Sequence, residues 1–201
     1  MITNHLQIVC DKIQALKKCK FIASGYKIVT SKSKVIFTSN YSGVFNSKIH
    51  HGNYFACSPV FIERILASNN LFNEDRKLAG SEDYELWMRI STSDNLHCFM
   101  AQSVSIQQHE ERSVLTMSSS MQLIERFTSF IKYTTENEKI VQFLGAKLGY
   151  FKMKNYLLLA VELAANNHKT DAKLYLKKAM SASLRCFFQR SFYATLKYLI
   201  F

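Results

Sequence analysis

The sequence predicts a mixed α/β domain followed by an all-α C-terminal region. Up to about residue 116, stretches with the 3.6-residue period of a helix alternate with stretches rich in Ile, Val and Tyr. After about Met117 nearly every stretch has helical periodicity. Hydrophobic residues make up 48% of the 201 residues, and a single proline with six glycines argues against a long flexible linker. We therefore divide the chain into residues 1–116 and residues 117–201.

The first elements follow from their periodicity. Apolar positions in residues 5–18 suit an amphipathic helix with Lys17 and Lys18 in its last turn. Residues 21–30 and 34–38 are predicted strands that form a hairpin around a polar turn. Residues 41–54 are predicted to be irregular.

The next elements are predicted from helix-start signals. Ser58 can cap free N–H groups and Pro59 suits a first helical position, so we expect a helix from there through Leu66. A loop then leads to a second helix over residues 81–92, and residues 95–106 are strand-like.

The C-terminal region is predicted to contain a helix hairpin. One apolar stripe consists of Leu157, Val161, Ala164 and Ala165, and the next runs from Tyr175 to Ser183. Residues 166–170 form the turn between them. This pairing is typical of helical repeats, but no second copy of it occurs in the chain.

The net charge of +11 is unevenly distributed. Residues 1–50 hold eight lysines against one acid, and residues 168–201 hold seven basic residues against Asp171. Solvated helix faces, an anionic membrane surface, a phosphorylated ligand and nucleic acid are the alternatives. Nucleic acid is the weakest, because the chain has no zinc-finger spacing and no aromatic-basic strand typical of RNA binding. The acid-free, aromatic and basic residues 185–201 suit either a membrane surface or packing on the helix hairpin.

The five cysteines indicate reduced thiols. Their number is odd, their spacing is scattered and no C-x-x-C occurs, so neither a disulfide framework nor a zinc site is predicted. The N-terminal 13 residues also lack the pattern of a secretory signal. We expect a cytoplasmic protein.

An adjacent acid pair, Glu82 and Asp83, stands at the predicted start of helix 81–92. Acids in a first turn are stabilised by the helix dipole by ~0.3–1 kcal/mol, and the same field favours the ionised form that a general base needs. Charge compensation of the helix and catalysis both remain open. Trp87 lies one turn later and suits core packing or a sugar face, while Arg89 suits an ion pair with Glu85 or a phosphate.

The order of these motifs resembles a known enzyme family. A Leu71-Phe72-Asn73-Glu74 loop leads to Ser81-Glu82-Asp83-Tyr84-Glu85-Leu86-Trp87-Met88-Arg89, and a strand then leads to Gln107-Gln108-His109. This order is similar to the acceptor-side half of family 2 glycosyltransferases, which have the GT-A fold, over roughly residues 5–115. The expected fold is therefore a partial GT-A-like mixed sheet with flanking helices.

The resemblance implies roles for individual residues. Asp83 would be the catalytic base of an inverting sugar transfer, and Glu82 would shape the acceptor site. Tyr84, Trp87 and Arg89 would contact the acceptor. His109 aligns with a family position that approaches the diphosphate or its metal ion.

The same resemblance implies a donor-binding half that the sequence does not provide. Residues 1–53 contain one acid, Asp11, and no Asp-x-Asp motif occurs, although the family uses that motif to hold Mg²⁺ or Mn²⁺. A fragment, a partner chain carrying the nucleotide-binding half, and a noncatalytic remnant are the three explanations. For the isolated chain we expect poor solubility or an obligate partner.

The implied activity is transfer of a sugar from a nucleotide-sugar to a glycan or lipid-linked acceptor, in cell-surface polysaccharide biosynthesis. The implied location is the cytoplasm or the inner face of the membrane. The alternative is a noncatalytic remnant that acts as a helical protein-binding or membrane-surface module.

Overall fold

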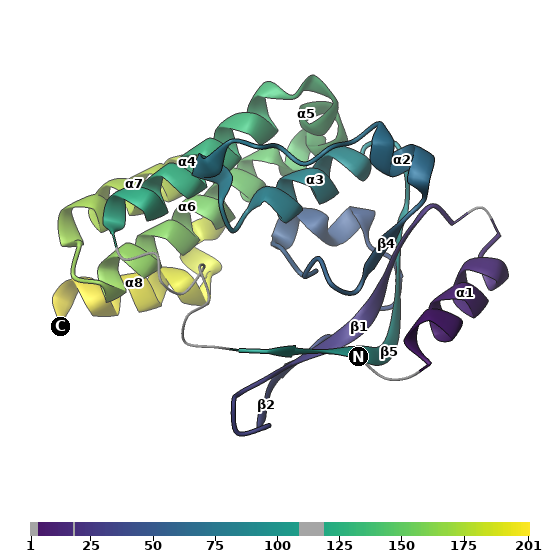
Figure 1. Cartoon of the computed structure of the whole chain (residues 1–201). Coiled ribbons are helices and arrows are strands. Elements are labelled where there is room, and N and C mark those ends of the chain that lie inside the picture. Colours follow the sequence, from purple (N-terminus) through teal and green to yellow (C-terminus); the bar gives the residue numbers. More distant parts are fainter. Residues whose placement is uncertain (1–3, 18, 109–118) are drawn as a thin grey trace. The chain divides into compact units, whose positions relative to one another are not determined.

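The computed structural model describes residues 4–17, 19–108 and 119–201 (Figure 1). It confirms the mixed α/β class, with a curled mixed sheet, flanking helices and a helical C-terminal region. The GT-A likeness stays a prediction. The chain forms two compact units. Unit 1 comprises Met1–Ile49, Asn53–Asn73 and Leu86–Thr116, and unit 2 comprises His50–Gly52, Glu74–Glu85 and Met117–Phe201.

Unit 1 is built around the strand β1 (Phe21–Val29). One edge of β1 pairs in parallel with β5 (Leu96–Gln107) along its whole length. The other edge pairs antiparallel with β4 (Val60–Ile62) near its start and with β2 (Val35–Thr38) near its end. A short strand, β3 (Gly43–Val44), pairs antiparallel with β5. The predicted hairpin and the predicted strand over residues 95–106 are therefore confirmed.

A bulge interrupts the long parallel pairing. Ser24 faces Phe99, but Gly25 faces Gln102, so β5 carries two additional residues at this point. A Cβ atom on Gly25 would lie 2.9 Å from the carbonyl oxygen of Met100, which is closer than real Cβ atoms approach. Gly25 is thus required by the close passage of the bulged strand.

Helix α1 (His5–Ala15) packs on β1 and β5. Its Val9 meets Ile22 and Phe99 in a small apolar cluster. The buried His5 ring is hydrogen-bonded through Nδ1 to Ser103 Oγ at 2.6 Å. Periodicity predicts this helix correctly, although the structure ends it at Ala15.

The predicted helix from Ser58 is wrong at its start. Residues Val60–Ile62 form strand β4, and the backbone N–H of Ser24 donates to the carbonyl oxygen of Pro59. The helix, α2 (Arg64–Ser68), begins only after Glu63. The free edge of β1 offers backbone hydrogen bonds that the local Ser-Pro signal does not anticipate.

Strand β2 is exposed along its length. Val35, Ile36 and Phe37 are consecutive apolar residues, and all three side chains are exposed. The strand order places β2 at an end of the sheet. An exposed apolar edge strand favours pairing with another chain. The expected need for a partner stays a prediction.

Helix α3 (Glu82–Ile90) is shared between the units, with Glu82–Glu85 in unit 2 and Leu86–Ile90 in unit 1. The 3₁₀ helix η2 (Arg76–Leu78) precedes it in unit 2, and the 3₁₀ helix η1 (Asn46–His51) also runs from one unit to the other.

Unit 2 is otherwise helical. Its core cluster draws on α4, α6, α7, the 3₁₀ helix η4 and α8, and α6 packs extensively on α7. The predicted hairpin is confirmed, with its turn between Ala165 and Lys169. No helix in the described ranges is long and apolar enough to cross a membrane. The elements are α4 (Ser120–Glu136), α5 (Glu138–Leu144), η3 (Gly145–Lys147), α6 (Leu148–Ala165), α7 (Lys169–Ala182), η4 (Leu184–Phe188) and α8 (Arg190–Ile200).

Candidate functional site

The candidate site is the acidic start of α3. Gly80 has a φ of +86°, a conformation that glycine adopts without strain, and it turns the chain into the helix. Its backbone N–H donates to Oε2 of Glu82. The Glu82 carboxylate therefore folds back over the turn that precedes it.

Asp83 lies next to Glu82 and is partly exposed. Its Oδ1 accepts a hydrogen bond of 2.7 Å from the backbone N–H of Tyr84. Both carboxylates thus accept backbone N–H groups at the helix start, where the dipole favours negative charge. This is the structural role that the sequence left open, and the catalytic roles of Asp83 and Glu82 stay predictions.

Tyr84 belongs to an aromatic cluster of unit 2. The ring is buried and stacks on Phe130 of α4, with ring centroids 4.7 Å apart and planes inclined by 25°. Phe151 of α6 contacts both rings. The position of Asp83 is therefore fixed by its neighbour in the chain, which helices α4 and α6 hold. In this state the Tyr84 ring is covered by protein, so its predicted contact with an acceptor stays a prediction.

Three charged residues from different helices interact: Glu82 of α3, Arg126 of α4 and Glu162 of α6. Arg126 of α4 is buried and pairs with Glu162 of α6, with Nη2 and Oε2 3.6 Å apart. Burial lowers the pKa of Arg126, whereas the carboxylates of Glu162 and Glu82 raise it. Burial raises the pKa of Glu162, and the charge of Arg126 partly offsets that shift. One guanidinium therefore interacts with two carboxylates, one of them at the candidate site.

The loop before α3 is attached to α4. Asp75 caps η2 by accepting from the backbone N–H of Lys77, and its Oδ2 accepts a 2.8 Å hydrogen bond from the hydroxyl of Tyr133. These hydrogen bonds lower the pKa of Asp75, the one from Lys77 most. The loop that leads to Glu82 is thus attached to α4 through Asp75.

The remaining acceptor residues belong to unit 1. Trp87 is only 2% exposed and contacts Phe21 of β1 and Phe72. Core packing is one of the two roles predicted for Trp87 from the sequence. Arg89 donates from Nη2 to the carbonyl oxygen of Leu71 at 2.6 Å, which holds the end of the preceding loop. Contact of either residue with an acceptor stays a prediction.

The expected Mg²⁺ or Mn²⁺ site stays a prediction. Within residues 4–17, 19–108 and 119–201, no three side chains of His, Cys, Asp or Glu come together in a way that would hold a metal ion. The metal-site prediction for His109 lies outside the described residues. We therefore assign no chemical step to a metal ion.

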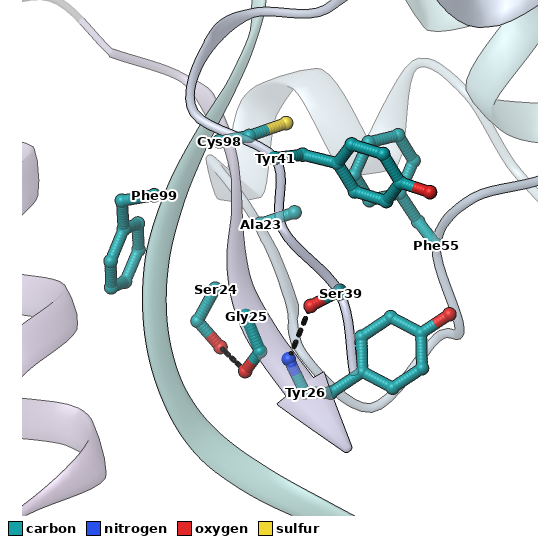
Figure 2. A pocket seen from close by; sticks show the side chains of 9 residues that line it. All are labelled: Ala23, Ser24, Gly25, Tyr26, Ser39, Tyr41, Phe55, Cys98 and Phe99. Carbon is teal, nitrogen blue, oxygen red and sulfur yellow. Dashed lines mark hydrogen bonds between the residues drawn. The ribbon is translucent and has the colours of Figure 1, made fainter. Parts of the chain in front are cut away.

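Unit 1 contains a small pocket between the sheet and the segment that follows β2 (Figure 2). It measures about 170 Å³, including space open to solvent, and none of the residues that line it is charged. Its polar groups are largely engaged: Ser39 Oγ accepts from the backbone N–H of Tyr26 at 2.7 Å, and Ser24 Oγ donates to the carbonyl oxygen of Gly25 at 3.4 Å. Burial raises the pKa of Cys98 in its wall to about 12, so this thiol is not a nucleophile at neutral pH. The pocket is smaller than typical ligand sites and has no charged side chain to bind a phosphate.

The residues that support the acid pair are not among those predicted from the sequence. Arg126 and Phe130 lie one turn apart on α4, 44 and 47 positions after Glu82 and Asp83. One signal was available, since Arg126 interrupts the apolar positions Leu123, Phe127 and Phe130 of an otherwise amphipathic helix.

A scan against models of protein families and a search of curated proteins both find no match for this chain.

Proposed function

We propose that the chain is the acceptor-side part of a family-2-like glycosyltransferase that transfers a sugar from a nucleotide-sugar to a glycan or lipid-linked acceptor. The observation that carries the proposal is the ordered Glu82-Asp83-Tyr84-Glu85-Leu86-Trp87-Met88-Arg89 motif, between a structured loop and strand β5. The donor-binding half would come from residues other than these 201.

The arrangement around Asp83 supports this assignment. The five residues that follow it, Tyr84 to Met88, are buried, whereas Asp83 itself remains partly exposed at the first turn of α3. An ionised carboxylate in such a place can accept a proton, while the rigid residues that follow keep it in position. The capping loop and the Tyr84 cluster provide that rigidity.

The proposed chemistry assigns different tasks to the two acids. Asp83 would take the proton of the acceptor hydroxyl as the hydroxyl oxygen attacks the anomeric carbon, and the nucleoside diphosphate would leave from the opposite face of the sugar. Glu82 accepts a hydrogen bond from the backbone N–H of Gly80 and interacts electrostatically with Arg126, and it would shape the acceptor side.

The test is a set of substitutions made in the cells that produce this chain. Three strains are needed: one with the gene deleted, one that carries Asp83→Asn and one that carries the control substitution Asp94→Asn. Mass spectrometry would then compare the surface glycans and lipid-linked glycans of these strains. Asp94 is a suitable control because it is also a partly buried acid, located beyond the end of α3. Immunoblots would verify equal protein levels.

We expect the deletion and Asp83→Asn to lose the same glycan, and Asp94→Asn to keep it. The loss of a general base typically lowers a rate by ~10²–10⁴-fold, enough to remove a product from the profile. A deletion that changes no glycan would contradict the proposal. A deletion that changes a glycan which Asp83→Asn preserves would make the chain a noncatalytic component.

A further inference from the structure

The C-terminal end of unit 2 exposes large apolar side chains beside basic ones. Phe188 of η4 is 86% exposed and Ile200 of α8 is 72% exposed. Tyr193 and Tyr198 of α8 are exposed as well. We name the set of Phe188, Arg190, Tyr193, Lys197, Tyr198 and Ile200 the tail surface; all six are exposed.

Four of the five α8 residues of the tail surface share one side of the helix, and Tyr198 lies at its margin. Arg190, Tyr193, Lys197 and Ile200 follow at intervals of three and four, which places them on one face. The opposite face, with Phe192 and Thr195 buried, packs on the rest of unit 2, where α6 and α7 contact α8. Helix α8 therefore has an apolar inner face for the core and an outer face that is aromatic, aliphatic and basic.

The charge around the tail surface decides which partner suits it. Residues 172–201 contain six basic residues and no acid. A two-fold contact between two copies would bring this patch onto itself and place like charges together, which is unfavourable. An anionic surface would complement the charge, and its apolar interior would accept the ring of Phe188 and the side chain of Ile200.

We propose that the tail surface docks on the face of an anionic lipid bilayer. The apolar side chains would enter the boundary between headgroups and acyl chains, and the basic side chains would lie among the lipid phosphates. Tyrosine, with an apolar ring and a polar hydroxyl, suits this boundary. With 11 residues, α8 is too short to span a bilayer and would lie in the plane of the interface. The docking does not depend on the transferase activity proposed above.

The experiment is co-sedimentation of the purified full chain with vesicles. We would compare phosphatidylcholine vesicles with vesicles of phosphatidylcholine and phosphatidylglycerol at 7:3, each in 0.1 M and 0.5 M NaCl. We expect at least tenfold tighter binding to the anionic vesicles at low salt, and weaker binding at high salt. Since a basic residue near an anionic membrane contributes about fivefold, Arg190→Gln/Lys197→Gln should weaken binding about 25-fold. Phe188→Ser/Ile200→Ser should weaken it at least tenfold.

Matched variants separate docking from general charge and from misfolding. Lys132→Gln/Lys139→Gln removes the same charge from exposed positions on α4 and α5 and should leave binding within about twofold. Far-UV circular dichroism should be the same for all variants, because every replaced side chain is exposed. Phe188→Trp should keep the binding to vesicles, and brominated lipid should quench the fluorescence of the new tryptophan. In the unchanged chain the fluorescence comes from buried Trp87, and brominated lipid should not quench it.

Three outcomes would overturn the proposal. One is equal or absent binding to both vesicle types. Another is an equal loss of binding from the Lys132/Lys139 control. The third is occupation of the tail surface by a nucleic acid or by a second copy of the chain. Displacement of the chain from anionic vesicles by a single-stranded 20-mer oligonucleotide would show the first. A dimer that Phe188→Ser dissociates, in a chain that binds no vesicles, would show the second.

Discussion

The stacking of Phe130 on Tyr84 offers a direct test of how the acid pair is held. Phe130 is 1% exposed, its ring centroid lies 4.7 Å from that of Tyr84, and Phe151 contacts it at 5.7 Å. Phe130→Ala removes the buried ring and leaves a cavity, which typically costs about 3–5 kcal/mol. Of this, about 0.5–1.5 kcal/mol belongs to the aromatic pairing itself.

Urea unfolding followed by far-UV circular dichroism measures this loss. With a denaturant slope of about 2–3 kcal/mol/M, near the upper end for small proteins, the midpoint should fall by about 1–2.5 M. Phe188→Ala provides the matched control, because the same ring is removed from an exposed position, and its effect should be within about 0.5 kcal/mol.

A double-mutant cycle isolates the contact with the candidate site. Tyr84→Leu and Phe130→Ala, alone and together, should give a coupling free energy of about 0.5–1.5 kcal/mol. A coupling indistinguishable from zero would refute the conclusion that α4 holds the start of α3. So would a Phe130→Ala variant as stable as Phe188→Ala.

Four further outcomes are expected. Arg126→Met should lower stability at pH 7 by about 1–2 kcal/mol, less than the ~3–5 for a fully buried pair because the Glu162 side chain is 38% exposed. Burial raises the pKa of Glu162 and the charge of Arg126 lowers it, so removal of Arg126 should let Glu162 take up a proton at a higher pH. The variant should therefore regain part of the lost stability as the pH falls towards 5. Arg126→Met/Glu162→Gln, which has no charge at position 162, should regain it at pH 7. Gly25→Ala should cost about 1–3 kcal/mol in urea unfolding, because its Cβ meets the backbone of the β5 bulge. Burial lowers the pKa of His5 from 6.5, so below pH 6.5 the unfolded chain binds a proton that the folded chain does not. The free energy of unfolding should therefore decline as the pH falls below 6.5, and His5→Gln should reduce that decline. The Cys98 thiol, with a pKa of about 12, should resist iodoacetamide at pH 8 until urea unfolds the chain, unlike the exposed cysteines.

Local patterns were sufficient for much of the fold. The β-branched and aromatic residues of 21–29 and 96–107 define two strands, and the apolar stripes of 148–165 and 169–182 define a helix hairpin. In each case the signal lies within the element itself. The helix expected from Ser58 failed because a neighbouring strand competes for the same backbone groups, which no local pattern reveals.

The candidate site was only partly predictable for the same reason. Glu82 and Asp83 are recognisable as helix-start acids, and their N–H contacts are local. The partners Arg126 and Phe130 come from a different helix, more than 40 positions later, so spacing within the motif does not indicate them. The sequence boundary at residue 116 likewise gave no sign that residues 74–85 belong to unit 2.

The assignment of residues 74–85 to unit 2 has a consequence for folding during synthesis. Tyr84 leaves the ribosome before the residues that bury it, and Phe151 is made 67 positions later. At 5–20 residues per second this delay lasts roughly 3–13 s. During that interval the acidic start of α3 has no helical partner, and β5 is complete before α4 exists. A chaperone that binds the nascent chain during this interval would protect these unburied residues from aggregation.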